Sequence, residues 1–282
     1  MNHIARIVAM FLIAQLIGLF VGVQMVGNKE IYSTFNVTPN QQPEDVGNSV
    51  LFILYVLAVA VIVVVIIRYF RWASFLLRAL ELLTIFVTSS IVFGVSLAYF
   101  NIPNAFEMSI VLSMLLVVLK FLYPKIKNVT AIISSSGVGA LFGFSFGIVP
   151  TLLFVILISL YDFISVFITK HMVYMAKEMS KMDLSFSVSS REKRYVREKG
   201  KRKEEEFSVE LGSGDIAIPL MLAVSTYSSF TLVDSLAVVL GSTIGLVIVL
   251  YYVTRKRIFL PALPPLCFCG VLFLAVSRVL LH

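Results

Sequence analysis

Long apolar stretches separated by short polar segments dominate this chain. An α-helix rises about 1.5 Å per residue and the hydrocarbon core of a bilayer is about 30 Å thick, so about 20 apolar residues can span it. The pattern predicts nine membrane-spanning helices, at residues 7–26, 50–67, 79–100, 108–123, 129–149, 152–169, 211–230, 236–253 and 258–281. The fourth stretch is short and only Pro150 separates the fifth from the sixth, so hydropathy alone leaves eight or ten spans open.

The composition agrees with a membrane protein and argues against several kinds of site. Hydrophobic residues make up 59% of the chain and charged residues 14%, whereas about 25% of the residues of a soluble domain are charged. The three histidines, His3, His171 and His282, are far apart in the sequence, and Cys267 and Cys269 lie inside an apolar stretch. We therefore expect no metal site, no cofactor, no disulfide framework and no histidine-dependent catalysis.

The distribution of positive charge predicts the topology. If the first span enters from the cytoplasm, only Lys29 and Arg278 of the 23 Lys and Arg residues lie outside. The positive-inside rule then places the amino terminus in the cytoplasm and the carboxyl terminus outside, with nine spans between them. The net charge of +7 is explained by this topology, and the basic residues are not interleaved with aromatic ones, so no nucleic-acid partner is expected.

One long hydrophilic segment divides the chain. Residues 170–207 are polar and rich in charge, and their low hydrophobicity favours a disordered cytoplasmic linker. The predicted organisation is therefore a six-helix part at residues 1–169, this linker, and a three-helix part at residues 208–282.

Glycines recur at helical spacing within several spans. Such a strip lets two helices approach closely, so packing is the expected role of these residues: Gly18, Gly22, Gly139, Gly143, Gly147, Gly241 and Gly245. The segment from Gly143 to Gly147 also matches the nucleophile elbow of soluble hydrolases. It lies inside a predicted span, with no strand before it and no histidine to act as base, so this interpretation is rejected.

Most ionisable residues in the spans have a simple structural explanation. Inserting a charged group at membrane depth costs at least roughly 2.5 kcal/mol of free energy, so each such residue needs a structural or functional explanation. Lys120, Asp234 and Arg278 lie near span ends, where side chains reach the interface, and Glu81 has Arg78 three residues earlier as a possible helical ion-pair partner.

Asp162 and Asp215 are different, because neither has a Lys or Arg within helical reach along its own span. Asp162 lies about 10 Å, and Asp215 about 7 Å, from the cytoplasmic ends of two spans that run in opposite directions. The two carboxylates are therefore expected at nearly the same depth. Polar residues repeat on one face of the first of these helices, at Ser159, Asp162, Ser165 and Thr169.

Two carboxylates at one depth suggest an aspartyl dyad. Like charges at short range cannot both ionise easily, so one carboxyl group serves as an acid and the other as a base. Such a pair can activate water to attack a peptide bond. Spacing alone leaves two alternatives open, an ion or proton pathway and a buried acid pair that only packs.

Three short motifs resemble the signatures of a known family. Tyr161-Asp162, Gly212-Ser213-Gly214-Asp215 and Pro261-Ala262-Leu263 are similar to the YD, GxGD and PAL motifs of the presenilin and signal peptide peptidase family of intramembrane aspartyl proteases. Their order and their placement on the sixth, seventh and ninth spans extend the resemblance over the whole chain. The resemblance implies that Asp162 and Asp215 are catalytic.

The same resemblance implies roles for the other motif residues. Gly212 and Gly214 would admit the substrate backbone, and the turn formed by Pro261, Ala262 and Leu263 would help to shape the site, as would Tyr161. Ser213 occupies a variable position where family members often carry Leu, so the fit of substrates and inhibitors does not carry over.

The residues themselves support a special role for the start of the ninth span. Pro261 lies four residues after Arg257, at the expected level of the two acids, and Pro264 and Pro265 follow. Prolines remove backbone donors, so an irregular segment is expected here, beside which an extended peptide could pair. An ordinary proline-marked helix start is the alternative.

The predicted function is hydrolysis of transmembrane peptides within the lipid bilayer by a two-aspartate dyad and water, and the alternative is a transporter or cation-leak channel using the same acids. A cytoplasmic amino terminus resembles presenilin rather than signal peptide peptidases. Obligatory partner subunits are not implied, and a homo-oligomer is compatible with the sequence. We expect a microbial homologue that acts alone in the plasma membrane.

Overall fold

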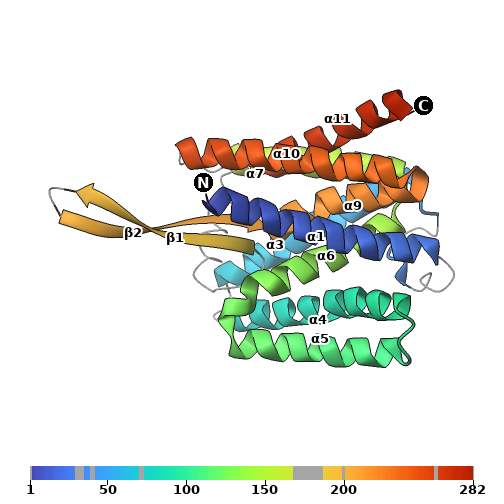
Figure 1. Cartoon of the computed structure of the whole chain (residues 1–282), viewed down its shortest axis with the longest axis horizontal. Helices are drawn as coiled ribbons and strands as arrows, with labels where there is room; N and C mark the ends of the chain where they lie inside the picture. Colours follow the sequence, from blue (N-terminus) through green and yellow to red (C-terminus); the bar gives the residue numbers. More distant parts are fainter. Residues whose placement is uncertain are drawn as a thin grey trace.

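Nine long helices pack side by side in the computed structural model (Figure 1). The structure describes residues 2–28, 35–38, 42–69, 73–167, 187–198, 201–256 and 260–281. Within these residues the long helices are α1 (Asn2–Gly27), α3 (Val46–Tyr69), α4 (Ala73–Tyr99), α5 (Ala105–Leu122), α6 (Lys127–Ser145), α7 (Ile148–Phe167), α9 (Ser213–Ser229), α10 (Leu232–Lys256) and α11 (Leu263–Leu281). A short 3-10 helix, η2 (Pro124–Ile126), joins α5 to α6. Helices α4 and α5 lie at one edge, α10 and α11 at the other, and α9 lies between them.

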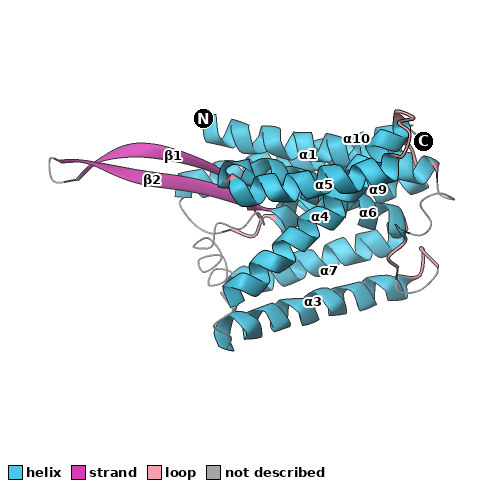
Figure 2. Ribbon diagram, turned by 90° about the horizontal axis from the view of Figure 1, so that it is seen from below, coloured by secondary structure: helices cyan, strands magenta, loops and turns pink. Residues whose placement is uncertain are grey.

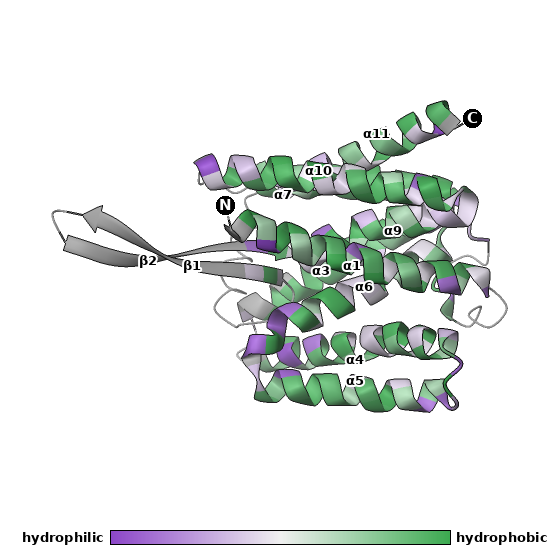
Figure 3. Ribbon diagram, in the orientation of Figure 1, coloured by the Kyte–Doolittle hydropathy of each residue, from purple (hydrophilic) through white to green (hydrophobic). Residues whose placement is uncertain are grey.

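The helices occur where the apolar stretches predicted them. Among the described helices, eight have at least 18 residues and enough apolar character to cross a membrane. Helix α9, with 17 residues, is the ninth. It contacts α1, α6, α7, α10 and α11, so other helices rather than lipid cover most of its surface. The hydropathy colouring in Figure 3 shows predominantly apolar helices throughout the bundle.

Most helix ends lie within a few residues of the predicted ones, and prolines lie near two of the boundaries that differ. Helices α6 and α7 separate at Phe146 and Gly147, and Pro150 lies in the first turn of α7, where a missing backbone N–H costs no helical bond. Helix α11 begins at Leu263 rather than at residue 258, because residues 260–262 are not helical. The irregular segment predicted before α11 is therefore present.

A β-hairpin, which the sequence analysis did not predict, precedes α9. Strands β1 (Ser187–Glu198) and β2 (Lys201–Gly212) pair in antiparallel register and project beyond the helices (Figures 1 and 2). The disorder expected for residues 170–207 is therefore wrong for the part of this segment that the structure describes.

The base of the hairpin is fixed to the bundle by two kinds of contact. Val188 and Leu211 are buried in an apolar cluster with Ile7 of α1. The Asn128 side chain of α6 donates to the Ser189 carbonyl at 2.8 Å and accepts from the Ser189 N–H at 3.0 Å. Because β2 ends at Gly212 and α9 begins at the next residue, these contacts also hold the start of α9.

Helix α9 packs closely against α1 and α6 at four glycines. The Leu220 side chain of α9 contacts Gly18 of α1 and Gly139 of α6. One turn later, the Val224 side chain contacts Gly22 of α1 and Gly143 of α6. The packing role predicted for these glycines is confirmed, and all three helices advance in the same direction along the contact.

The other glycines of the predicted strips divide into two groups. Gly241 and Gly245 of α10 face backbone atoms of α11, so they also serve helix packing. Gly147 lies at the break between α6 and α7, against the carboxylate of Glu44 in a polar connecting segment. The helix-packing role predicted for Gly147 is therefore wrong.

Charged residues inside the bundle pair across helices. Glu81 of α4, with 1% of its side chain exposed, lies 2.7 Å from Lys120 of α5, a partner that sequence spacing did not indicate. Asp234 of α10 accepts a hydrogen bond from Ser277 at 2.7 Å and lies 3.6 Å from Arg278 of α11. These pairs fasten neighbouring helices to one another.

The glycine contacts predict a large effect of one added methyl group. In Gly143→Ala the new Cβ would meet Val224 Cβ at 2.6 Å and the Met221 carbonyl oxygen at 2.7 Å, and the backbone atom cannot retreat without moving α9. We expect a loss of about 1–3 kcal/mol of stability, as is typical for overpacking. Thermal unfolding in detergent measures this change.

Gly27→Ala is the matched control, because an added Cβ there meets nothing within 4 Å. If both variants unfolded at the wild-type temperature, helices α6 and α9 would not be in this close contact.

Candidate active site

Asp162 lies on α7 and faces the interior of the bundle. Only 3% of it is exposed. The backbone N–H of Leu263, the first residue of α11, lies within hydrogen-bonding range of its carboxyl group. Its Oδ2 atom has no hydrogen-bond partner among the described residues. A buried carboxylate with an available oxygen is well placed to bind water or a reacting group.

Asp215 lies in the first turn of α9 and faces Asp162 closely enough for the two carboxyl groups to interact electrostatically. Its Oδ2 accepts a hydrogen bond from the Gly212 N–H at 3.3 Å. This bond joins the last residue of β2 to the first turn of α9 and restricts the aspartate side chain. The sequence analysis placed these two acids at one level, and the structure brings them together.

The start of α11 is the third element at this place. Pro261 and Leu263 are buried, and Leu263 is the residue whose backbone approaches Asp162. Cys267 follows one helical turn later; it is buried, contacts Ser159 of α7, and interacts electrostatically with both aspartates. Helices α7, α9 and α11 therefore meet around the two acids.

Tyr161 and Ala262, two other predicted site residues, pack against apolar clusters. Tyr161 is partly buried against the apolar cluster that contains Leu220 and Val224, and Ala262 packs against the cluster that contains Ile216. Thr169, from the polar stripe on the same helix as Asp162, lies outside the described residues.

The two glycines of the GSGD segment have different surroundings. A Cβ at Gly212 would lie 3.2 Å from the Asp215 carboxylate, so a side chain there would crowd the acid. A Cβ at Gly214 would meet nothing within 4 Å, and Gly214 is exposed. The backbone at Gly214 is therefore accessible from outside the helix.

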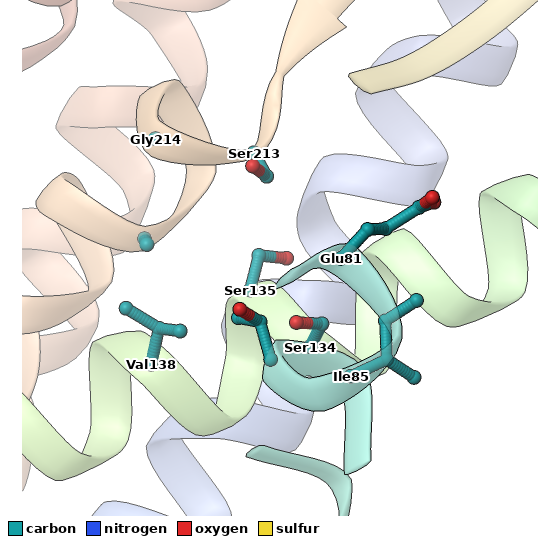
Figure 4. A pocket seen from close by; sticks show the side chains of 9 residues that line it. Glu81, Ile85, Ser134, Ser135, Val138, Ser213 and Gly214 are labelled. Carbon is teal, nitrogen blue, oxygen red and sulfur yellow. The ribbon is translucent and has the colours of Figure 1, made fainter. Parts of the chain in front are cut away.

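A cavity of about 130 Å³ adjoins this backbone (Figure 4). It lies between α4, α6 and the start of α9, with Ser213 and Gly214 at its α9 side. The α4 and α6 residues that line it are Glu81, Thr84, Ile85, Ser134, Ser135 and Val138. Sequence reasoning did not predict this cavity, because α4 and α6 are far from α9 in the chain.

The sequence analysis named Leu263 but did not foresee that its backbone N–H approaches Asp162, and it did not place Cys267 at the site. The Leu263 N–H and the Cys267 thiol approach the acids because α11 begins beside α7, and no spacing rule within one span indicates such an approach. Among the described residues no group of three or more His, Cys, Asp or Glu side chains could hold a metal ion. Two neighbouring carboxyl groups can exchange protons with each other and with a bound ligand.

A model of the family described as signal-peptide peptidase, presenilin aspartyl protease matches residues 8–277. The chain belongs to this family. It is therefore an enzyme of the intramembrane aspartic endopeptidase class and an integral multi-pass membrane protein. A comparison with curated proteins finds no match.

The fold is similar to that of solved structures of a presenilin family intramembrane aspartate protease. One of them, in space group C222, has a TM-score of 0.70 and 24% identity, and the match covers 98% of this chain and 99% of that chain. Another, in space group P2, has a TM-score of 0.68 and 24% identity, with 97% and 96% covered. At this identity the likeness concerns the fold.

Proposed function

We propose that this family member hydrolyses peptide bonds of transmembrane substrates by means of Asp162, Asp215 and a water molecule. The observation that supports the proposal is the meeting of the two carboxyl groups beside the non-helical start of α11. The family assignment adds support, because the match extends over residues 8–277 rather than over these few residues.

The two carboxyl groups divide the proton transfers between them. In the active form one is ionised and the other is protonated. The ionised carboxylate removes a proton from water as the water oxygen attacks the peptide carbonyl carbon, and the protonated carboxyl group donates its proton to the carbonyl oxygen. The tetrahedral intermediate then collapses and the C–N bond breaks. The departing nitrogen receives the proton of the protonated carboxyl group, and one hydroxyl of the intermediate gives its proton to the other carboxylate, which restores the pair with one proton.

The substrate must be extended around the peptide bond that is cleaved, because in a helix the backbone carbonyl and N–H groups are already hydrogen-bonded to one another. Two features of the site suit an extended chain. Residues 260–262 are not helical, so their backbone groups are available for pairing, and Gly214 leaves its backbone uncovered. We therefore assign substrate positioning to Gly214 and to the segment from Pro261 to Leu263, with Gly212, Ser213 and Tyr161 shaping the site.

The setting of this activity is also part of the proposal. The amino terminus lies in the cytoplasm and the carboxyl terminus outside, in the plasma membrane of a microbe. The protein acts without obligatory partner subunits, and self-association is compatible with activity. A transporter or cation-leak pathway would use the same acids, but no observation favours it over hydrolysis.

Asp162→Asn and Asp215→Asn should each abolish cleavage of a single-span peptide, with turnover lower by at least about 10²–10⁴-fold, the range typical of general acid–base catalysis. An amide of the same shape fills the space of the acid but cannot serve both proton-transfer roles. Products are measured by mass spectrometry with purified protein in detergent or vesicles. Glu107→Gln, the same chemical change on the exposed start of α5, should retain activity. Near wild-type turnover in either Asp variant would remove that acid from the mechanism.

Turnover should follow a bell-shaped pH profile with its maximum between weakly acidic and neutral pH. Two negative charges about 5 Å apart repel by roughly 3 kcal/mol at an effective dielectric near 20, so the pair tends to hold one proton. At low pH both groups are protonated and the base is missing; at high pH both are ionised and the acid is missing. A rate that rose steadily into the alkaline range, or reversible inhibition by a metal chelator, would contradict the dyad.

Tags placed before Met1 and after His282 should be accessible from opposite faces of the membrane, and the 170–207 segment from the cytoplasmic face. The distribution of Lys and Arg is the physical reason. Protease protection of each tag in sealed vesicles and in permeabilised ones measures this topology. Accessibility of both tags from one face would exclude an odd number of spans.

A further inference from the structure

Gln15 is a polar residue deep inside the apolar helix α1. Its side chain is fully buried, with 0% exposed. Apolar neighbours on α1 include Phe11 and Ala14, which belong to the same buried core. In a bilayer protein, a buried amide without a structural or functional use is expensive.

The Gln15 amide makes one long-range hydrogen bond. Its Nε2 donates to the carbonyl oxygen of Ile216 on α9 at 2.9 Å, and its Oε1 is buried without a hydrogen-bond partner among the described residues. Ile216 directly follows Asp215. Within the described part of the chain, the one hydrogen bond of this side chain therefore reaches the helical turn that carries one of the two acids.

This turn of α9 receives little support from its own helix. Pro219 lies inside α9 and has no N–H, so the carbonyl of Asp215, four residues earlier, lacks its helical donor. Gly212 and Gly214 flank Ser213 and add backbone freedom just before the acid. Support from a neighbouring helix is consequently more important here than in a regular helix.

The contact between α1 and α9 holds the Gln15 amide in register with this turn. Gln15 bonds to Ile216, Gly18 lies against Leu220, and Gly22 lies against Val224. These three contacts advance along both helices in the same order, about one turn at a time. The close glycine contacts thus fix the height of the amide relative to Asp215.

We propose that Gln15 is a positioning residue that holds the first turn of α9, and with it the Asp215 carboxyl group, opposite Asp162. This inference rests on the proposed proteolytic function. The Gln15 amide contributes little to the free energy of folding, because the cost of burying its oxygen without a donor offsets the gain from its one hydrogen bond. Its role is to keep the two acids in the correct relative position.

Gln15→Met tests this role, because methionine has a similar length and flexibility but no N–H donor. We expect kcat for a single-span peptide to fall by about tenfold or more, with KM changed by less than about twofold, since a misplaced acid affects the chemical step more than binding. The unfolding temperature should stay equal or rise. Gln24→Met is the matched control on the same helix and should leave kcat unchanged, because Gln24 is only half-buried.

Hydrogen exchange supplies a readout that does not depend on activity. In Gln15→Met, amides in the first turns of α9 should exchange faster, whereas those after Val224 should keep wild-type rates. A kcat within twofold of wild type together with unchanged exchange would overturn the inference while leaving the proteolytic function intact. A fall in kcat that only parallels a fall in unfolding temperature would assign Gln15 a purely structural role. Absence of cleavage by the wild-type protein would instead contradict the proposed function.

Discussion

The close packing of α9 between α1 and α6 is the contact on which the rest of this structure depends. Leu220 and Val224 each occupy the space between two glycines, so three helices approach one another at backbone distance. Without a hydrophobic driving force between helices in lipid, such close van der Waals contact is a main source of helix association. It also surrounds the helix that carries Asp215 with other helices, which suits its length of 17 residues.

The site is assembled from one regular helix and from the first turns of two others. Asp162 is held by the regular helix α7, Asp215 by the first turn of α9 after a strand, and the Leu263 N–H by the start of α11 after a non-helical segment. Backbone without helical partners is tolerated at membrane depth only when protein or a water-filled cavity surrounds it. Backbone of this kind surrounds the two acids, which agrees with a place where the backbone of a substrate binds.

The sequence predicted the features that depend on local composition. Apolar stretches indicated the helices, and the absence of a nearby Lys or Arg singled out Asp162 and Asp215. The prolines from Pro261 onward indicated the irregular start of α11. It did not predict the hairpin, because β1 and the first half of β2 are rich in charge, and apolar and polar residues alternate only over residues 207–212 at the end of β2. Contacts such as Gln15 with Ile216 were also missed, since 201 positions separate the two residues and neither is unusual in its own helix.

The separation of α9 from α1 and α6 along the chain has a consequence for how the molecule is made. The amino-terminal six helices are synthesised before α9 and reach the membrane without the helix that fills the space between Gly18 and Gly139. Until residue 229 has been added, the glycine faces of α1 and α6 must be covered by lipid or by each other. We therefore expect α9 to dock late, beside the base of the hairpin that Asn128 fixes to α6.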